Sequence, residues 1–310
     1  MTQTVDTPAS ATSTPEAPKK RITMGRILSW TVLVLVLFIT LFPFYWMLRT
    51  ALSNGKSISA QSSNLLPADF TLGAFKRVLG LSSLEQAQAE GGSGAAINFW
   101  RYLLNSVIVA TVVTVGQVFF SAMAAYAFSR MRWPGRDLVF GLFLAALMVP
   151  PIFTMLPNFV LIKQLGLLNT YPGIILPFFF MTPFAIFFLR QFFLGISPEI
   201  EEAARLDGAG HFRIFLRVIL PMSTAPLATL AILTYIGIWN EYLWPLLVAT
   251  DENMRVLTVA LGIFRSSTPQ GLIDWPGLMA ATLLSALPII ILFCIFGKKV
   301  VNNIQFSGIK

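Results

Sequence analysis

The chain has 310 residues, of which 55% are hydrophobic and only 12% are charged, and its formal net charge is +8. This composition excludes a soluble globular protein and indicates an integral membrane protein. The basic excess is attributed to membrane topology rather than to nucleic-acid binding, because no basic stripe with interleaved aromatic residues is present.

The N-terminal part of the chain is predicted to contain a tail, one membrane span and a long loop. Residues 1–26 are expected to form a disordered cytoplasmic tail, because the first 18 are rich in Thr, Ser, Pro and Ala. The apolar run 27–48 is longer than the core of a signal peptide and lacks a small-x-small cleavage site, so it predicts an uncleaved first transmembrane helix. Residues 49–102 are predicted to form an extracytoplasmic loop.

Within this loop, Gly55-Lys56-Ser57 resembles the end of a phosphate-binding loop. The spacing does not fit, because Thr50 stands where the first glycine is required. A nucleotide site is therefore not expected in this chain.

Five further apolar runs have about the 20 residues that a helix needs to cross a bilayer. They lie at 103–128, 138–160, 173–193, 227–248 and 278–296. Together with 27–48 they predict an all-α integral membrane protein with six transmembrane helices, a core at 103–297 and a cytoplasmic C-terminal tail at 298–310.

Prolines recur inside these runs, and in a membrane they require neighbouring helices or a water-lined cavity to satisfy the freed carbonyls. They are Pro150, Pro151, Pro177, Pro183, Pro245 and Pro288. Kinked helices around a pathway are expected.

The distribution of basic residues predicts the orientation. With the N-terminus inside, 14 of the 22 Lys and Arg residues fall on the inner side, and five of the other eight lie in the long first loop. Because long loops count little in this comparison, both termini and the segment 197–221 are predicted to face the cytoplasm.

The segment 197–221 is a charged stretch between two apolar runs and is predicted to form a helix-turn-helix, which we call the polar hairpin. Ser197 and Pro198 are typical of a helix start, and Glu201 and Arg205 are spaced to pair on the surface. Asp207-Gly208 predicts a turn with glycine in the left-handed conformation.

The second helix of the hairpin has an apolar pattern at helical spacing, and Pro221 is expected to stop or kink it. The apolar residues are Phe212, Phe215, Leu216 and Ile219. Such a hairpin could be an ordinary cytoplasmic loop, but its residues favour a specific role.

Glu202-Ala203-Ala204, Asp207-Gly208-Ala209, Val218 and Leu220-Pro221 resemble the EAA loop of the membrane subunits of ATP-driven importers. Val218 stands where that family usually has Ile, a volume-conserving difference. The resemblance implies a type I ABC importer transmembrane domain whose hairpin docks on a separate ATPase. The residues assigned to this coupling are Glu202, Ala203, Ala204, Asp207, Gly208 and Pro221.

A second polar group, Asn240, Glu241 and Tyr242, lies within the fifth predicted span. A carboxylate inside the membrane costs about 2.5 to 3.5 kcal/mol on insertion scales, so it usually faces a cavity or a partner. These residues are candidates for the solute path, and the alternative is a helix-packing hydrogen bond or an interfacial aromatic anchor. The segment resembles the Trp-Asn-Glu-Phe stretch of MalG-like permeases in maltose-type importers, with Tyr242 replacing Phe.

This resemblance implies a permease subunit for a di- or oligosaccharide of the maltose, maltodextrin or trehalose type, with glycerol-3-phosphate or another polyol as the alternative. The implied partners are a second homologous permease forming a heterodimer, two ATP-binding subunits and an extracytoplasmic solute-binding protein. The implied location is the plasma (inner) membrane, and the lipid bilayer is the surrounding phase.

No enzymatic activity, metal site or cofactor is expected on this chain, because His211 is the only histidine and Cys294 the only cysteine. ATP and Mg are expected on the partner ATPase. An ion-coupled secondary transporter is the rival from another class, although such proteins usually show repeats and several buried ionisable groups. A membrane-embedded enzyme is disfavoured by the lack of paired carboxylates.

Overall fold

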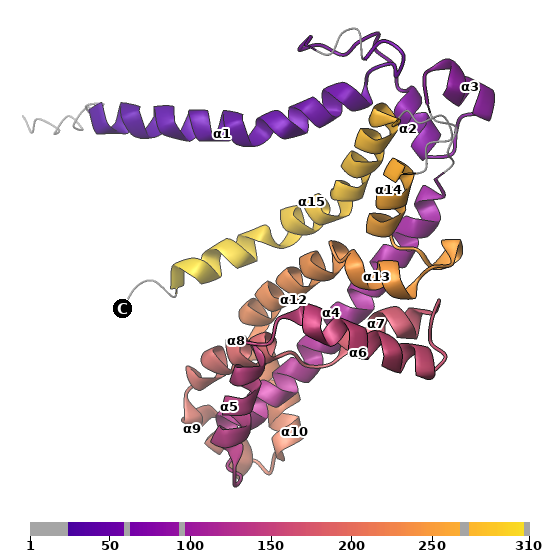
Figure 1. Cartoon of the computed structure of the whole chain (residues 1–310). Helices are drawn as coiled ribbons and strands as arrows, with labels where there is room; N and C mark the ends of the chain where they lie inside the picture. The colour runs from indigo at the N-terminus through magenta and orange to yellow at the C-terminus, as the bar shows by residue number, and fades with distance from the viewer. Residues whose placement is uncertain (1–23, 59–62, 93–96, 267–272, 307–310) are drawn as a thin grey trace, which may run out of the picture. The chain divides into compact units, whose positions relative to one another are not determined.

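The computed structural model describes residues 24–58, 63–92, 97–266 and 273–306, and it places side chains as far as residue 296. These residues form helices joined by turns and loops (Figure 1), and no strand occurs among them. The chain divides into two compact units, residues 1–46 and 47–310. The predicted disordered tail up to residue 23 and the C-terminal residues 307–310 lie outside the described residues.

The helices follow one another along the chain and differ widely in length. They are α1 (Met24–Ala51), α2 (Gly73–Val78), α3 (Leu84–Ala89), α4 (Phe99–Arg130), α5 (Arg136–Ala146), α6 (Pro151–Gln164), α7 (Tyr171–Phe179), α8 (Pro183–Leu194), α9 (Pro198–Leu206), α10 (His211–Ile214), the π-helix η1 (Phe215–Ile219), α11 (Leu220–Met222), α12 (Thr224–Trp239), α13 (Leu243–Val248), the 3-10 helix η2 (Glu252–Met254), α14 (Leu257–Ser266) and α15 (Trp275–Phe306).

Three of these helices, α1, α4 and α15, are long and apolar enough to cross a membrane alone. Three further spans are bent pairs: α5 with α6 at 98°, α7 with α8 at 45°, and α10–α11 with α12 at 81°. Counting each pair as one span gives the six that the sequence predicts. The predicted single run 138–160 is nevertheless wrong in shape, because the chain turns sharply at Leu147–Pro150 between α5 and α6.

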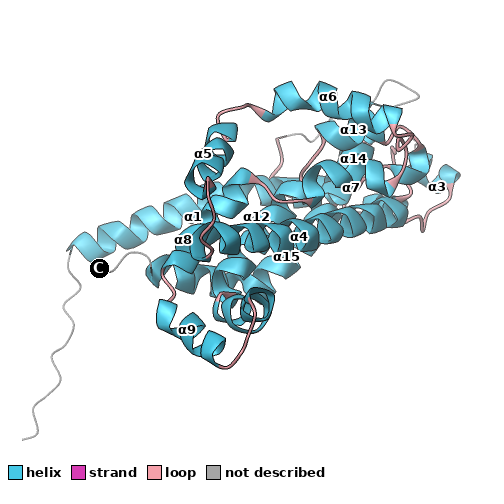
Figure 2. Ribbon diagram, turned by 90° about the horizontal axis from the view of Figure 1, so that it is seen from below, coloured by secondary structure: helices cyan, strands magenta, loops and turns pink. Residues whose placement is uncertain are grey.

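Helix α4 is the centre of the second unit, and α7, α8 and α12 pack along it. In Figure 2 it runs beside α12 over much of the unit. Small buried residues on α4, including Ala110, Gly116 and Ala122, allow this close approach. At Gly116, an added Cβ would lie 2.3 Å from the ring of Phe179 on α7.

A carbonyl that a proline leaves without its donor inside α7 accepts a hydrogen bond from another helix. Pro177 in α7 has no N–H to donate to the carbonyl of Gly173, four residues earlier. The indole N–H of Trp244 on α13 donates to that carbonyl at 3.3 Å and to the carbonyl of Ile174 at 3.2 Å. The predicted satisfaction of freed carbonyls by neighbouring helices is therefore confirmed at Pro177.

The predicted extracytoplasmic loop 49–102 contains two short helices, α2 and α3, and α4 already begins at Phe99. Arg77 on α2 forms ion pairs with Asp274 at 3.2 Å and with Glu90 at 3.3 Å. Asp274 also accepts a hydrogen bond from the Gly277 N–H in the first turn of α15. The described part of this loop is therefore folded and tied to α15. Helix α15 itself continues to Phe306, into the predicted tail 298–310.

The two polar ends of the second unit are far apart. The polar hairpin with α9 and α10 lies at one end, and α2 and α3 lie at the other (Figures 1 and 2). Helix α4 runs from one end to the other. This arrangement agrees with a topology in which the hairpin and the first loop face opposite sides of the membrane.

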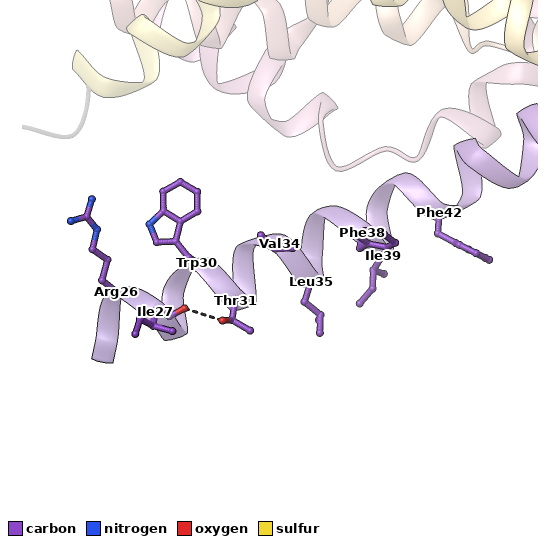
Figure 3. A pocket seen from close by; sticks show the side chains of 9 residues that line it. All are labelled: Arg26, Ile27, Trp30, Thr31, Val34, Leu35, Phe38, Ile39 and Phe42. Atoms are coloured by element: carbon purple, nitrogen blue, oxygen red, sulfur yellow. Dashed lines mark hydrogen bonds between the residues drawn. The ribbon is translucent and has the colours of Figure 1, made fainter. Parts of the chain in front are cut away.

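A hollow beside α1 is lined by side chains of that helix alone among the described residues (Figure 3). They are Arg26, Ile27, Trp30, Thr31, Val34, Leu35, Phe38, Ile39 and Phe42. Because a single helix lines it, this hollow is an open apolar surface and not an enclosed solute site.

Candidate functional site

The polar hairpin begins with α9, and the sequence determines how this helix ends. Gly208 has φ +79°, in the left-handed region. Its N–H donates to the carbonyl of Arg205 at 2.9 Å, and the N–H of Ala209 donates to the carbonyl of Ala204 at 3.0 Å. These two bonds form a Schellman motif, so the predicted glycine turn is confirmed.

The start of α9 agrees with the prediction only in part. Pro198 occupies the first helical turn, and Ser197 precedes it at the N-cap position. The Ser197 side chain, however, makes no capping hydrogen bond. Proline supplies the fixed φ of the first turn and needs no N–H partner there.

Most residues assigned to coupling lie on the surface of the hairpin. Glu202, Ala203, Asp207, Gly208 and Pro221 are exposed. Ala204 is half-buried and packs against a core formed by α4, α8 and the second half of the hairpin. The hairpin thus presents charged and small residues together on its surface.

The two most exposed large apolar residues of the same hairpin were not predicted as part of the site. Leu206, at the end of α9, is 89% exposed, and Phe212, in α10, is 61% exposed. Leu216, which shares the predicted apolar spacing with Phe212, is 39% exposed. The sequence signal that could have identified Leu206 is its position directly before the Asp207-Gly208 turn, where the helix ends.

The buried face of the second half of the hairpin consists of Ile214, Phe215 and Ile219, each at most 1% exposed. The ring of Phe215 lies 5.6 Å from that of Tyr126 and 6.2 Å from that of Phe119, both on α4. Of the four residues with the predicted apolar spacing, Phe215 and Ile219 are therefore the buried ones. Pro221 lies inside α11, and the sharp bend to α12 comes two residues later, at Ser223.

Glu201 differs from its neighbour Glu202 because it is buried, at 4% exposure. Its carboxylate lies 3.1 Å from the Nε of Arg130, and its other oxygen lies 3.7 Å from Arg205. The predicted Glu201–Arg205 pair exists, but the prediction that it lies on the surface is wrong. Arg130, far earlier in the chain, is the closer partner.

The candidate solute-path residues occupy the break between α12 and α13. The Glu241 carboxylate accepts a hydrogen bond from the Trp244 N–H at 3.1 Å, which caps α13. The Asn240 amide donates to the Ile236 carbonyl at 2.8 Å, and both Asn240 and Tyr242 are exposed. Glu241 is therefore engaged in a hydrogen bond within the break, and Asn240 and Tyr242 are exposed.

Within the described ranges, no three His, Cys, Asp or Glu side chains gather where they could hold a metal ion.

Comparison with known proteins agrees with this geometry. Residues 117–304 match the model of the family described as "Binding-protein-dependent transport system inner membrane component". The chain is 36% identical to the probable ABC transporter permease protein YurM of Bacillus subtilis, with 95% of this chain and 92% of that protein covered.

The names of two further relatives include the solute that each is named for transporting. The diacetylchitobiose uptake system permease protein NgcG of Streptomyces coelicolor is 32% identical, covering 92% of this chain and 87% of that protein. The sn-glycerol-3-phosphate transport system permease protein UgpE of Escherichia coli O157:H7 is 32% identical, covering 91% of this chain and 96% of that protein.

Among solved structures, the chain is similar to a chain of a bacterial ABC transporter involved in the import of the acidic polysaccharide alginate. The TM-score is 0.74 at 25% identity, and the match covers 92% of this chain and 99% of that chain. The expected type I importer fold is thereby confirmed. The chain belongs to the family of binding-protein-dependent transport system inner membrane components, and it is a multi-pass permease of an ABC importer.

Proposed function

We propose that this chain is one of two permease subunits of an ATP-driven sugar importer, and that its polar hairpin docks on a separate ATPase subunit. The exposure of Leu206 and Phe212 beside Glu202 and Gly208 carries this proposal. Apolar side chains of this size gain about 1.5 to 3 kcal/mol each when a partner buries them. A groove on the ATPase is the partner that would do so.

In this proposal the chain itself hydrolyses nothing. Two ATPase subunits bind ATP and Mg, and their closure pushes the two hairpins of the permease pair together. The second hairpin belongs to a homologous permease, which completes a heterodimer around the solute path. Closure then switches the path between inward-facing and outward-facing states through the bent spans, in the manner of other rigid-body transitions.

The docking surface is tested by the variant Leu206→Ser with Leu81→Ser as the matched control. Leu81 is also strongly exposed, at 72%, but it lies in the loop at the opposite end of the unit. Co-purification of the ATPase subunits with the tagged chain is expected to fall about tenfold for Leu206→Ser. It should stay at the wild-type level for Leu81→Ser. Undiminished co-purification with Leu206→Ser would contradict docking through the hairpin.

For the solute, a di- or oligosaccharide of the maltose, maltodextrin or trehalose type is proposed, delivered by an extracytoplasmic binding protein. The relative named for diacetylchitobiose uptake supports a sugar. The relative named for sn-glycerol-3-phosphate transport supports the alternative, a polyol phosphate.

Uptake of labelled maltose, trehalose, N,N′-diacetylchitobiose and sn-glycerol-3-phosphate by cells with and without the chain separates these solutes. Uptake should require ATP and survive collapse of the membrane potential at constant ATP. Uptake that stops with the potential would favour the ion-coupled secondary transporter instead.

We further propose that Asn240, Glu241 and Tyr242 border the solute path. The break between α12 and α13 leaves Asn240 and Tyr242 exposed, and the Glu241 carboxylate is engaged as a cap. Asn240→Ala is therefore expected to raise the KM for uptake severalfold while leaving ATPase co-purification unchanged. Glu241→Gln should retain the cap, since the amide oxygen still accepts from the Trp244 N–H. An unchanged KM in Asn240→Ala would remove that residue from the path.

Both termini and the hairpin are proposed to face the cytoplasm of the inner membrane. The folded loop with α2 and α3 then faces outward, where the binding protein arrives. Its position at the far end of α4 supports this assignment.

A further inference from the structure

A buried ion pair connects the polar hairpin to the end of α4. Arg130 is the last residue of α4, and Glu201 lies in the middle of α9. The Arg130 Nε and a Glu201 carboxylate oxygen are 3.1 Å apart, and the two side chains are only 9% and 5% exposed. Each charge needs the other, because a single charge left at this depth is strongly unfavourable.

Arg130 contacts a third element as well. Its Nη2 donates hydrogen bonds to the backbone carbonyls of Phe193 and Ile196, at the C-terminal end of α8 and just beyond it. Carbonyls at a helix C-terminus lack partners within the helix and carry partial negative charge, which suits a guanidinium group. The Nη2 of Arg130 thus serves the two carbonyls, while its Nε faces the Glu201 carboxylate as an ion pair at 3.1 Å without making a hydrogen bond to it.

The other half of the hairpin is held to α4 by rings rather than by charge. Phe215 contacts Tyr126 and Phe119, and together with Ile214 and Ile219 it fills a core shared with α8. Both halves of the hairpin thus rest on the same end of α4. By contrast, Glu202 and Leu206, the neighbours of Glu201 on α9, are exposed.

We propose that Arg130 and Glu201 are positioning residues that transmit displacement of the docked hairpin to α4 and to the end of α8. This inference rests on the proposed function, since the displacement comes from the ATPase subunits. The observation that supports it is the separation of roles along α9: exposed residues are available to the ATPase, and the one buried carboxylate is engaged with the membrane helices. Because breaking a buried pair is costly, α9, α4 and the end of α8 should move together.

The test uses the complete importer in proteoliposomes, with both permeases, the ATPase subunits and the binding protein. Glu201→Gln and Arg130→Gln remove one charge each. Glu199→Gln is the matched control, because Glu199 is exposed on the same helix and outside the proposed docking residues. The readouts are ATPase co-purification, ATP hydrolysis and solute uptake. The solute is whichever of maltose, trehalose, N,N′-diacetylchitobiose and sn-glycerol-3-phosphate the wild-type importer carries.

Uptake per ATP hydrolysed is expected to fall about tenfold in Glu201→Gln and Arg130→Gln, within the range typical of coupling between distant sites. ATPase co-purification should remain, and Glu199→Gln should match the wild type. The charge-conserving variant Glu201→Asp should show a higher uptake per ATP hydrolysed than Glu201→Gln. A purely structural role predicts instead that uptake and hydrolysis fall in parallel, and that result would overturn the proposal.

The double variant Arg130→Gln/Glu201→Gln separates coupling from folding, because it leaves no charge unpaired. It is expected to unfold at the wild-type temperature and yet to remain uncoupled. A double variant with wild-type uptake per ATP would overturn the proposal. If the wild-type chain binds no ATPase subunit at all, the proposed function itself is contradicted. If the wild-type complex forms and the variants keep the wild-type uptake per ATP, only the role of the ion pair is contradicted.

Discussion

At the scale of single residues, Gly208 determines the geometry of the proposed docking surface. Its φ of +79° costs a residue with a Cβ about 1 to 2 kcal/mol. An added Cβ would meet no atom within 4 Å, so the cost is one of backbone conformation alone. Gly210 offers a matched control, because it has an ordinary extended φ of −72° and an equally open environment.

Gly208→Ala is therefore expected to loosen the hairpin, and Gly210→Ala is not. Hydrogen exchange of the amides in 198–222 should speed up about five- to thirtyfold in Gly208→Ala, which corresponds to 1 to 2 kcal/mol. The same peptides in Gly210→Ala should exchange at the wild-type rate. Equal exchange in the two variants would show that the left-handed turn is not required.

The roles of Glu201 and Glu202 show what local sequence rules can and cannot predict at this scale. The i, i+4 rule finds the Glu201–Arg205 pair, since both residues lie on one helix. It contains no information on Arg130, which tertiary packing brings from the end of α4. The motif predicted which residues form the hairpin, and the fold determines which of the two adjacent glutamates is buried.

At the scale of elements, the length of an apolar run predicts that a segment enters the membrane, but it does not predict whether the segment is straight or bent. The runs at 138–160 and 173–193 have the length of spans, yet they bend by 98° and 45° at breaks directly followed by a proline, Pro151 and Pro183. The prolines in the sequence indicated kinks, because each removes a backbone donor. Which neighbour satisfies the freed carbonyl depends on packing between distant segments, and for Pro177 it is Trp244.

Trp244→Phe tests this bridge between α13 and α7. The indole is 3% exposed, and its N–H serves two carbonyls. Without the indole N–H, the buried Gly173 carbonyl has lost the donor that stands in for the N–H missing at Pro177. The chain should therefore be destabilised by about 1 to 3 kcal/mol. Thermal unfolding of the full chain in detergent should show a lowered Tm. Trp275→Phe is the control, since that ring is 43% exposed, and an equal loss in both variants would contradict the bridging role.

At the scale of the whole molecule, the second unit separates its two polar surfaces by the length of α4. One end carries the hairpin, and the other carries the loop stabilised by the Arg77–Asp274 pair. In the proposed function, a force applied to the hairpin and a solute delivered at the loop would act on opposite ends of one long helix. This arrangement is useful to an importer only if the two ends face opposite sides of the membrane.

Cysteine accessibility tests this orientation directly. Cys294 is the only cysteine, so Cys294→Ala gives a cysteine-free background. In it, Leu81→Cys reports on the loop end and Glu199→Cys on the hairpin end, and both positions are exposed. A membrane-impermeant maleimide should label Leu81→Cys in intact spheroplasts, because the excess of basic residues retains the hairpin side in the cytoplasm. Glu199→Cys should react only after permeabilisation. The reverse pattern would place the hairpin outside, where no ATPase can reach it, and ATP-driven coupling through this surface would be impossible.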